Sequence, residues 1–267
     1  MTRIRDCFDM VVFDWAGTMV DFGSRAPVLA LVEAFAALGV TVSEAEARKD
    51  MGRAKVDHVR ALFEQADVAQ AWRAAQGGDP DSAAIDWVMA ALEAPMVRLA
   101  QETATLIPGA ADTVAWLRSE GLKIGSCTGY TRAMMQAVLS RAAQQGYAPD
   151  TVICAHETPQ GRPSPQMIYK ACLDLDVWPL SRVIKVDDAE VGMAEGRNAG
   201  CFTVGVAASG NMVGLSEEAL AAAQPEARAL LLAEASERLY AAGADLVIET
   251  VADLFPALEA EASRRAV

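Results

Sequence analysis

Four polar residues and one glycine in the sequence have the types and spacing needed for chemistry on phosphorus. The carboxylate of Asp14, at the end of an apolar run, can attack phosphorus and form an aspartyl-phosphate. The negative charge of the phosphoryl oxygens must then be offset, commonly by Mg²⁺ on hard oxygen ligands such as Asp14 and Asp188. Thr128 and the backbone N–H groups near Gly129 can hold phosphoryl oxygens at a helix start, and Arg162 adds a fixed cation.

The residue two positions after Asp14 limits the kinds of bond to phosphorus that the enzyme could cleave. An enzyme that cleaves a phosphorus–oxygen bond with such an aspartate usually carries a second acid there, which protonates the departing oxygen. Here that position is Ala16. A carbon leaving group needs an electron sink instead, and an amine that forms a Schiff base with a neighbouring carbonyl provides one. Lys55, within the segment MGRAKVDHVRALF at residues 51–63, is the candidate amine.

The neighbours of Lys55 support a role in catalysis, although each has an ordinary structural alternative. His58 shares a helix face with Lys55 and could relay protons, while Met51 could form an apolar wall that desolvates the amine. Tyr130 could close the site from the opposite side, and Gly52 could give local backbone freedom. Alternatively, the lysine is a solvated charge, the histidine and methionine are packing residues and the glycine is a turn residue.

The elements that must position these groups alternate between strand and helix. The sequence predicts a doubly wound α/β fold with a mainly parallel sheet, because near-continuous apolar runs alternate with helical patterns. In such a sheet, ligands gather at the carboxyl ends of the strands, where the polar groups lie. The expected strands cover residues 10–14, 122–127, 151–155, 182–187, 201–206 and 244–249.

A long helical stretch separates the first two strands. A parallel crossover needs far fewer residues, so we expect a helical cap domain at residues 22–102, inserted into a core formed by residues 1–21 and 103–267. Ser43 and Glu46 fit a capping box at the start of one cap helix. From Ser216 onward the acidic, Ala-rich sequence predicts a pair of surface helices packed on the core.

The composition restricts the partners and the compartment. A formal net charge of −13 argues against nucleic acid or anionic membranes as partners, because both require basic patches. The five cysteines are scattered, which suits free thiols in a reducing cytoplasm. No apolar run approaches the ~20 residues of a membrane span, and the first residues do not resemble a signal peptide, so we expect a cytoplasmic protein.

The order of these motifs resembles the haloacid dehalogenase superfamily, with DWAGT first, CTGYT second, Arg162 third and the acidic pair DD fourth. The cap segment with Lys55, together with further matching islands between residues 11 and 206, resembles the phosphonoacetaldehyde hydrolase family in particular. The resemblance implies that Lys55 forms the imine and Asp14 is the nucleophile. It also implies Mg²⁺ on Asp14, Asp188 and the main-chain carbonyl of Ala16, phosphonoacetaldehyde as substrate, and a homodimer joined through the cap helices.

One departure from the superfamily pattern leaves a choice open. Members often carry another acid four residues after the metal-binding aspartate, where this sequence has Gly192; either Glu190 or Asp187 could replace it. Two other functions also remain. A general phosphatase for phosphate monoesters would not need Lys55, and a non-catalytic binding module would tolerate the loss of Asp14.

Overall fold

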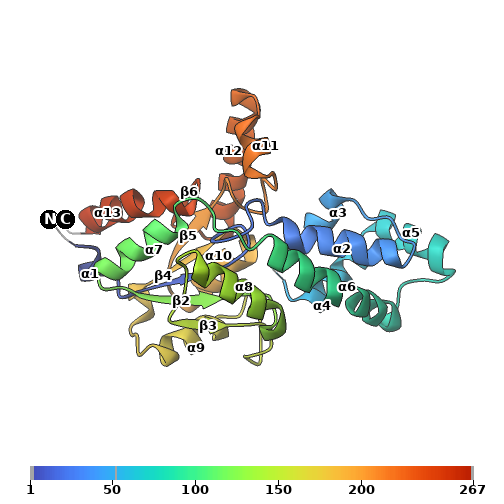
Figure 1. Ribbon diagram of the computed structural model, residues 1–267, viewed down its shortest axis with the longest axis horizontal. Coiled ribbons are helices and arrows are strands. Elements are labelled where there is room, and N and C mark those ends of the chain that lie inside the picture. Colours follow the sequence, from blue (N-terminus) through green and yellow to red (C-terminus); the bar gives the residue numbers. More distant parts are fainter. Residues whose placement is uncertain (1–2, 52, 266–267) are drawn as a thin grey trace.

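The structure is a computed structural model that describes residues 3–51 and 53–265 (Figure 1). Its centre is one parallel sheet of six strands in the order β3-β2-β1-β4-β5-β6. The strands are β1 (Met10–Phe13), β2 (Lys123–Cys127), β3 (Thr151–Ile153), β4 (Val183–Asp187), β5 (Phe202–Val206) and β6 (Leu246–Ile248). Each lies within a predicted run, so the predicted parallel α/β sheet is confirmed.

Helices cover both faces of the sheet, because the central strands are apolar on both sides. Val11 and Phe13 pack with α7, α8 and α13 on one face, while Met10 and Val12 pack with α9 on the other. Strand β1, with every residue buried, lies between β2 and β4. The covering helices are α7 (Ala110–Ser119), α8 (Arg132–Gln144), α9 (Gln166–Asp174), α10 (Glu190–Ala199) and α13 (Leu254–Arg265). A short helix, α1 (Ile4–Cys7), precedes β1.

Five helices between β1 and β2 gather into a lobe beside the sheet (Figure 1). An edge-to-face chain of Phe35, Phe63 and Trp72 joins three of them at the lobe's core. The predicted capping box is confirmed, since Ser43 and Glu46 cap each other's backbone at the start of α3. The helices are α2 (Arg25–Ala37), α3 (Glu44–Arg48), α4 (Lys55–Glu64), α5 (Ala66–Gln76) and α6 (Ser82–Glu102). The boundaries 22–102 for a cap domain stay a prediction.

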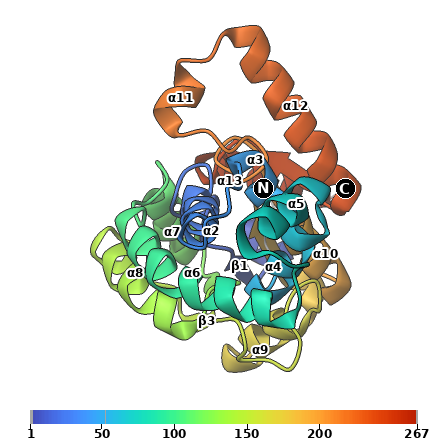
Figure 2. The same ribbon diagram turned by 90° about the vertical axis from the view of Figure 1, so that its right-hand side faces the viewer.

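The helices that follow β5 depart from the expectation. Helices α11 (Glu217–Ala221) and α12 (Pro225–Ala242) form, but most of the pair projects from the body as an arm instead of lying on the core (Figures 1 and 2). Only Ala235 and Leu239 of α12 and Leu220 of α11 are buried. The rest of α12 has no continuous apolar stripe that could hold it against the sheet. Helix α13, which we did not predict, covers the sheet face further along the chain.

Two further observations concern the cysteines and the length of the apolar helices. All five cysteines are free thiols in the described part of the chain. Among residues 3–51 and 53–265, no helix combines the length and apolar character needed to cross a bilayer.

Candidate active site

The carboxyl ends of three neighbouring strands and the first turn of α4 in the helical lobe meet at one small cavity. Asp14 follows β1, Thr128 follows β2 and Asp188 follows β4, while Lys55 is the first residue of α4. The cavity measures about 40 Å³, which is room for little more than a few water molecules. Its lining consists of Asp14, Ala16, Ser24, Pro27, Met51, Arg53, Lys55, Thr128, Gly129, Tyr130, Arg162, Asp188 and Ala189.

This lining contains every residue that the sequence analysis assigned to the site except two. Gly52 lies outside the described residues, and His58 is buried but does not line the cavity. Among the residues that sequence reasoning missed, Arg53 is the notable one. It is an exposed cation that pairs with Asp50 at 2.9 Å, and its position two residues before Lys55 could have drawn attention to it.

Arg162 is the buried cation that organises the core side of the site. Its Nη2 lies 2.8 Å from the Asp14 carboxylate and 3.3 Å from that of Asp187, and it donates to the main-chain oxygen of Cys127 at 2.8 Å. Its Nε donates to Glu195 at 3.0 Å. A planar guanidinium held on several sides in this way has one fixed orientation, and it keeps positive charge beside Asp14.

Three buried carboxylates crowd together at the ends of β1 and β4. Asp14, Asp187 and Asp188 each have an oxygen within 4.8 Å of the others. Burial, and then the negative charge of Asp187, raises the pKa of Asp14 to about 6. Burial and the two neighbouring carboxylates also raise the pKa of Asp188 well above its ordinary value. A hard divalent cation bound by these oxygens would relieve the repulsion, so the donor set fits Mg²⁺.

Lys55 has the environment that a nucleophilic amine requires. Its side chain is half-buried, and Met51 Sδ lies 3.9 Å from its Nζ. Burial lowers the pKa of Lys55 to about 8, against an opposing effect from the negative charge of Asp14. The positive end of the α4 dipole also disfavours a protonated amine at this first helical position.

His58 lies behind Lys55 in the same helix and is fully buried. Burial, and then the positive charge of Lys55, lowers the pKa of His58 to about 3, so the ring is neutral at physiological pH. Neither ring nitrogen makes a hydrogen bond of normal geometry among the described residues, although the backbone oxygens of Ala47 and Lys49 lie close enough to favour the protonated ring. A neutral imidazole can both donate and accept a proton, so it is suited to relay one.

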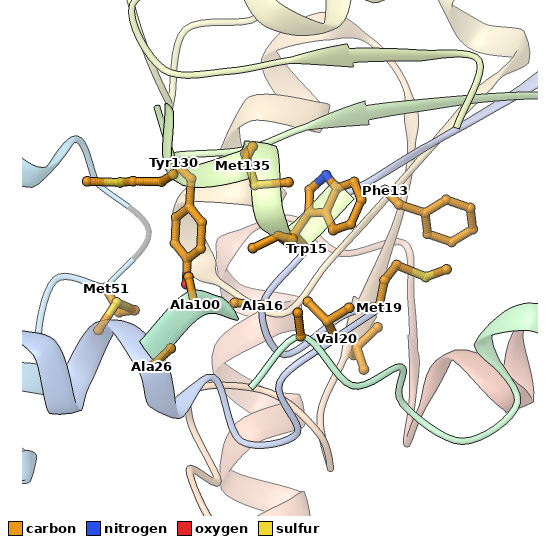
Figure 3. Packing of buried hydrophobic residues seen from close by; sticks show 14 of the residues in the cluster. Phe13, Trp15, Ala16, Met19, Val20, Ala26, Met51, Ala100, Tyr130 and Met135 are labelled. Atoms are coloured by element: carbon orange, nitrogen blue, oxygen red, sulfur yellow. The ribbon is translucent and has the colours of Figure 1, made fainter. Parts of the chain in front are cut away.

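The walls between the charged groups are apolar. Figure 3 shows the ring of Tyr130 between Met51 of the cap and Ala16 of the loop after β1, all within one hydrophobic cluster. The backbone N–H of Tyr130 donates to the Thr128 hydroxyl at 3.1 Å, which fixes the loop after β2. Such walls exclude water and strengthen every charge interaction inside the cavity.

Comparisons with known proteins identify relatives of this chain. A family model described as haloacid dehalogenase-like hydrolase matches residues 8–200. A phosphonoacetaldehyde hydrolase of Paraburkholderia phytofirmans is 47% identical over 246 residues, which cover 92% of each chain. One of Bacillus cereus is 40% identical over 94% of this chain and 95% of its own. The crystal structure of a phosphonoacetaldehyde hydrolase-like protein from Oleispira antarctica superposes with a TM-score of 0.94 at 37% identity, covering 97% of this chain and 94% of that one.

These similarities extend over nearly the whole chain, including both the parallel sheet and the helical lobe. They agree with the resemblance read from the sequence motifs and with the parallel sheet of the structure. The chain belongs to the haloacid dehalogenase-like hydrolase family, and within it to the group of relatives named phosphonoacetaldehyde hydrolases.

Proposed function

We propose that the protein hydrolyses the carbon–phosphorus bond of phosphonoacetaldehyde to acetaldehyde and phosphate. The observation that carries the proposal is one cavity lined by both the Asp14 carboxylate and the Lys55 amine, with Ala16 at the position where an acid for an oxygen leaving group would stand. The named activity of the relatives from Paraburkholderia phytofirmans and Bacillus cereus supports it.

In the first step the neutral amine of Lys55 condenses with the aldehyde and releases water as the imine forms. With a pKa of about 8, about a tenth of the amine is neutral at pH 7. His58, neutral and buried behind Lys55, relays the proton of this step. Met51 and Tyr130 keep bulk solvent away from the imine.

In the second step the Asp14 carboxylate attacks phosphorus and the carbon–phosphorus bond breaks. The bonding electrons move into the protonated imine and leave an enamine on Lys55. Arg162, Thr128 and the N–H groups near Gly129 hold the phosphoryl oxygens as this charge moves. Mg²⁺, held by Asp14, Asp188 and the main-chain carbonyl of Ala16, would supply the remaining charge neutralisation when bound.

Two hydrolyses complete the cycle. The enamine takes up a proton and the resulting imine is hydrolysed to acetaldehyde, which restores Lys55. Water cleaves the aspartyl-phosphate, releases phosphate and restores Asp14. One water is released in imine formation and two are consumed, so the net reaction uses one water. Lys55 belongs to the cap and Asp14 to the core, so the cap must open to admit substrate and close for reaction.

Borohydride trapping tests the assignment of Lys55. With phosphonoacetaldehyde and borohydride, we expect a stable adduct on the Lys55 peptide and none in Lys55→Arg. Lys170→Arg, a change on the surface of α9, is the matched control and should leave the adduct intact. Trapping that persists in Lys55→Arg would refute the imine. Equal hydrolysis of a simple phosphate ester by both proteins would instead favour a general phosphatase.

We also propose a homodimer joined through the cap helices, in a cytoplasmic setting that suits the free thiols. Trp87 on α6 and Val56 on α4 are large apolar side chains that a single chain leaves exposed. Covering them against a second copy would remove apolar surface from water. Light scattering coupled to size exclusion should give the mass of two chains, and Trp87→Ser should shift the protein toward one.

A further inference from the structure

Arg48, the last residue of α3 in the helical lobe, is held by oxygens from the loops that follow β1 and β5. Its Nη1 donates to the main-chain oxygen of Gly23 at 3.0 Å and to the side-chain oxygen of Asn211 at 3.1 Å. Its Nη2 donates to the main-chain oxygen of Gly214 at 2.9 Å. The Arg48 side chain is only 16% exposed, so these charge-assisted bonds form largely out of water, where they are strong.

The loop after β5 leaves a space that the guanidinium fills. A Cβ built on Gly214 would lie 2.6 Å from Arg48 Cζ and 2.7 Å from Arg48 Nε. These separations are far inside van der Waals contact, so a side chain at position 214 would displace the Arg48 side chain. We call the three residues that receive the guanidinium, Gly23, Asn211 and Gly214, the arginine cradle.

The arginine cradle is fixed to the loops that carry the sheet side of the active site. The Gly23 N–H donates to the main-chain oxygen of Ser209 at 2.7 Å, and the Ser209 hydroxyl donates to that of Gly17 at 2.7 Å. The backbone N–H of Asn211 donates to the Asp188 carboxylate at 2.7 Å. The loops after β1 and β5 are therefore tied to each other and to the cavity.

On the lobe side, Arg48 leads directly into the segment that carries Lys55. The main-chain oxygen of Arg48 accepts the Met51 N–H at 3.3 Å and the side-chain amide of Asn211 at 3.5 Å. Lys55 then begins α4, and both Met51 and Lys55 line the cavity. Fixing Arg48 in the arginine cradle therefore sets the place from which the amine reaches the cavity.

We propose that Arg48 is the latch that holds the helical lobe closed over the cavity and so positions Lys55. Opening of the lobe withdraws the guanidinium from the arginine cradle, and closing returns it. Several directional bonds are then lost or made together, which gives two distinct states. Arg48 does not line the cavity, so it is a positioning residue that acts through Lys55. The inference rests on the proposed function in one respect, the opening of the lobe for substrate.

Hydroxyl-radical footprinting of the substrate-free protein tests the latch, because the radical oxidises side chains that contact water. Met51 and Tyr130 meet between the lobe and the sheet and are only 8% and 7% exposed, so their oxidation reports opening. Met10, fully buried in the sheet, is the internal reference. Arg48→Gln should raise the oxidation rates of Met51 and Tyr130 by about threefold or more and leave that of Met10 unchanged. Arg48→Lys should give a smaller increase, because one ammonium cannot reproduce the guanidinium's fork.

Gly214→Ala tests the same latch from the cradle with the arginine still present. Its Cβ takes the space of the guanidinium, so Met51 and Tyr130 should be oxidised faster, as in Arg48→Gln. Gly121→Ala is the matched control. The φ of Gly121 is +86° and that of Gly214 is +67°, so both alanines strain the backbone, but a Cβ on Gly121 meets nothing within 4 Å. The control should therefore keep the wild-type oxidation rates.

Unchanged oxidation of Met51 and Tyr130 in both Arg48→Gln and Gly214→Ala would overturn the latch. An equal increase at Met10 would also overturn it, because the variant would then be loosened throughout, and so would an equal effect of Gly121→Ala. If Arg48→Gln does not fold, Gly214→Ala and Arg48→Lys decide by the same criteria.

Turnover supplies a second readout that a merely structural role would not give. With phosphonoacetaldehyde, Arg48→Gln should lower kcat by about tenfold while the melting temperature changes by no more than a few degrees, because the closed state is less populated. An unchanged kcat in a protein that hydrolyses this substrate would contradict the positioning of Lys55. Footprinting needs no substrate, so failure of the latch and failure of the proposed function are separate results.

Discussion

The lowered pKa of Lys55 leads to a quantitative prediction about Met51. Burial is the cause of the shift from 10.5 to about 8, and Met51 Sδ is 3.9 Å from the Lys55 amine. At pH 7, a pKa of 8 leaves about a tenth of the amine neutral, whereas 10.5 leaves about 0.03%. Admitting water at this wall can therefore reduce the reactive fraction by up to about 300-fold.

The perturbation is Met51→Ala, which removes the thioether and opens the amine to solvent. Competitive acetylation with trace acetic anhydride, quantified peptide by peptide with mass spectrometry, reports the neutral amine at each pH without requiring turnover. In wild type the labelling of Lys55 should rise with a midpoint near pH 8. In Met51→Ala the midpoint should move up by about one unit or more, which would reduce labelling at pH 7 by about tenfold or more.

A matched control separates this effect from general loosening of the cap. Met89 lies on α6, is half-buried and does not line the cavity, so Met89→Ala should leave the Lys55 midpoint unchanged. The reasoning is refuted if wild-type Lys55 titrates near 10.5, because burial would then not activate the amine. It is also refuted if the Lys55 midpoint in Met51→Ala is the same as in wild type and in Met89→Ala.

Two further predictions concern the core side of the site, and a third concerns Asp21, a buried carboxyl between β1 and α2 that accepts the Ala26 backbone N–H. Asp14→Asn should abolish phosphate release, measured colorimetrically, while borohydride still traps substrate on Lys55; loss of both would contradict the separate roles of carboxylate and amine. Arg162→Lys should lower kcat by about 100-fold, since an ammonium cannot reproduce the guanidinium's fork between Asp14 and Glu195, and unchanged steady-state kinetics would contradict this. Burial raises the pKa of Asp21 to about 6, so the folded state binds its proton more tightly than the unfolded state, and this contribution to stability falls as pH rises from about 4 to 6. The free energy of unfolding of metal-free Asp21→Asn, measured with urea, should therefore fall less than that of wild type between pH 4 and 6, by up to about 3 kcal/mol. The same pH dependence in both proteins would contradict the assignment.

The sequence predicted the parts of this protein that depend on local pattern. Apolar runs without alternation marked strands buried on both faces, and all six appear in one parallel sheet. The carboxyl-edge rule for such sheets placed Asp14, Thr128 and Asp188 at one edge, and the structure brings them to one cavity. Ser43 and Glu46 were predictable because a capping box needs only neighbours along the chain.

Tertiary structure alone decided features that depend on packing between distant segments. Helical spacing gave His58 the same face as Lys55, but the packing of the cap puts it behind the cavity wall. Arg53 also lines the cavity, although the sequence analysis did not assign it to the site. The helices after β5 were expected on the core, yet most of α12 extends away, and only Ala235 and Leu239 in it are buried.

The sequence also left open whether Asp187 or Glu190 lies beside Asp14 and Asp188, and only the tertiary structure distinguishes the two acids. Both acids flank Asp188 in the sequence, and nothing in their spacing separates them. The direction of each side chain depends on the last residues of β4, the first turn of α10 and the arm that carries Arg238, which come together only in the folded chain. Residue type and order thus determined the chemistry available, while packing across the sheet determined which carboxylate reaches the site.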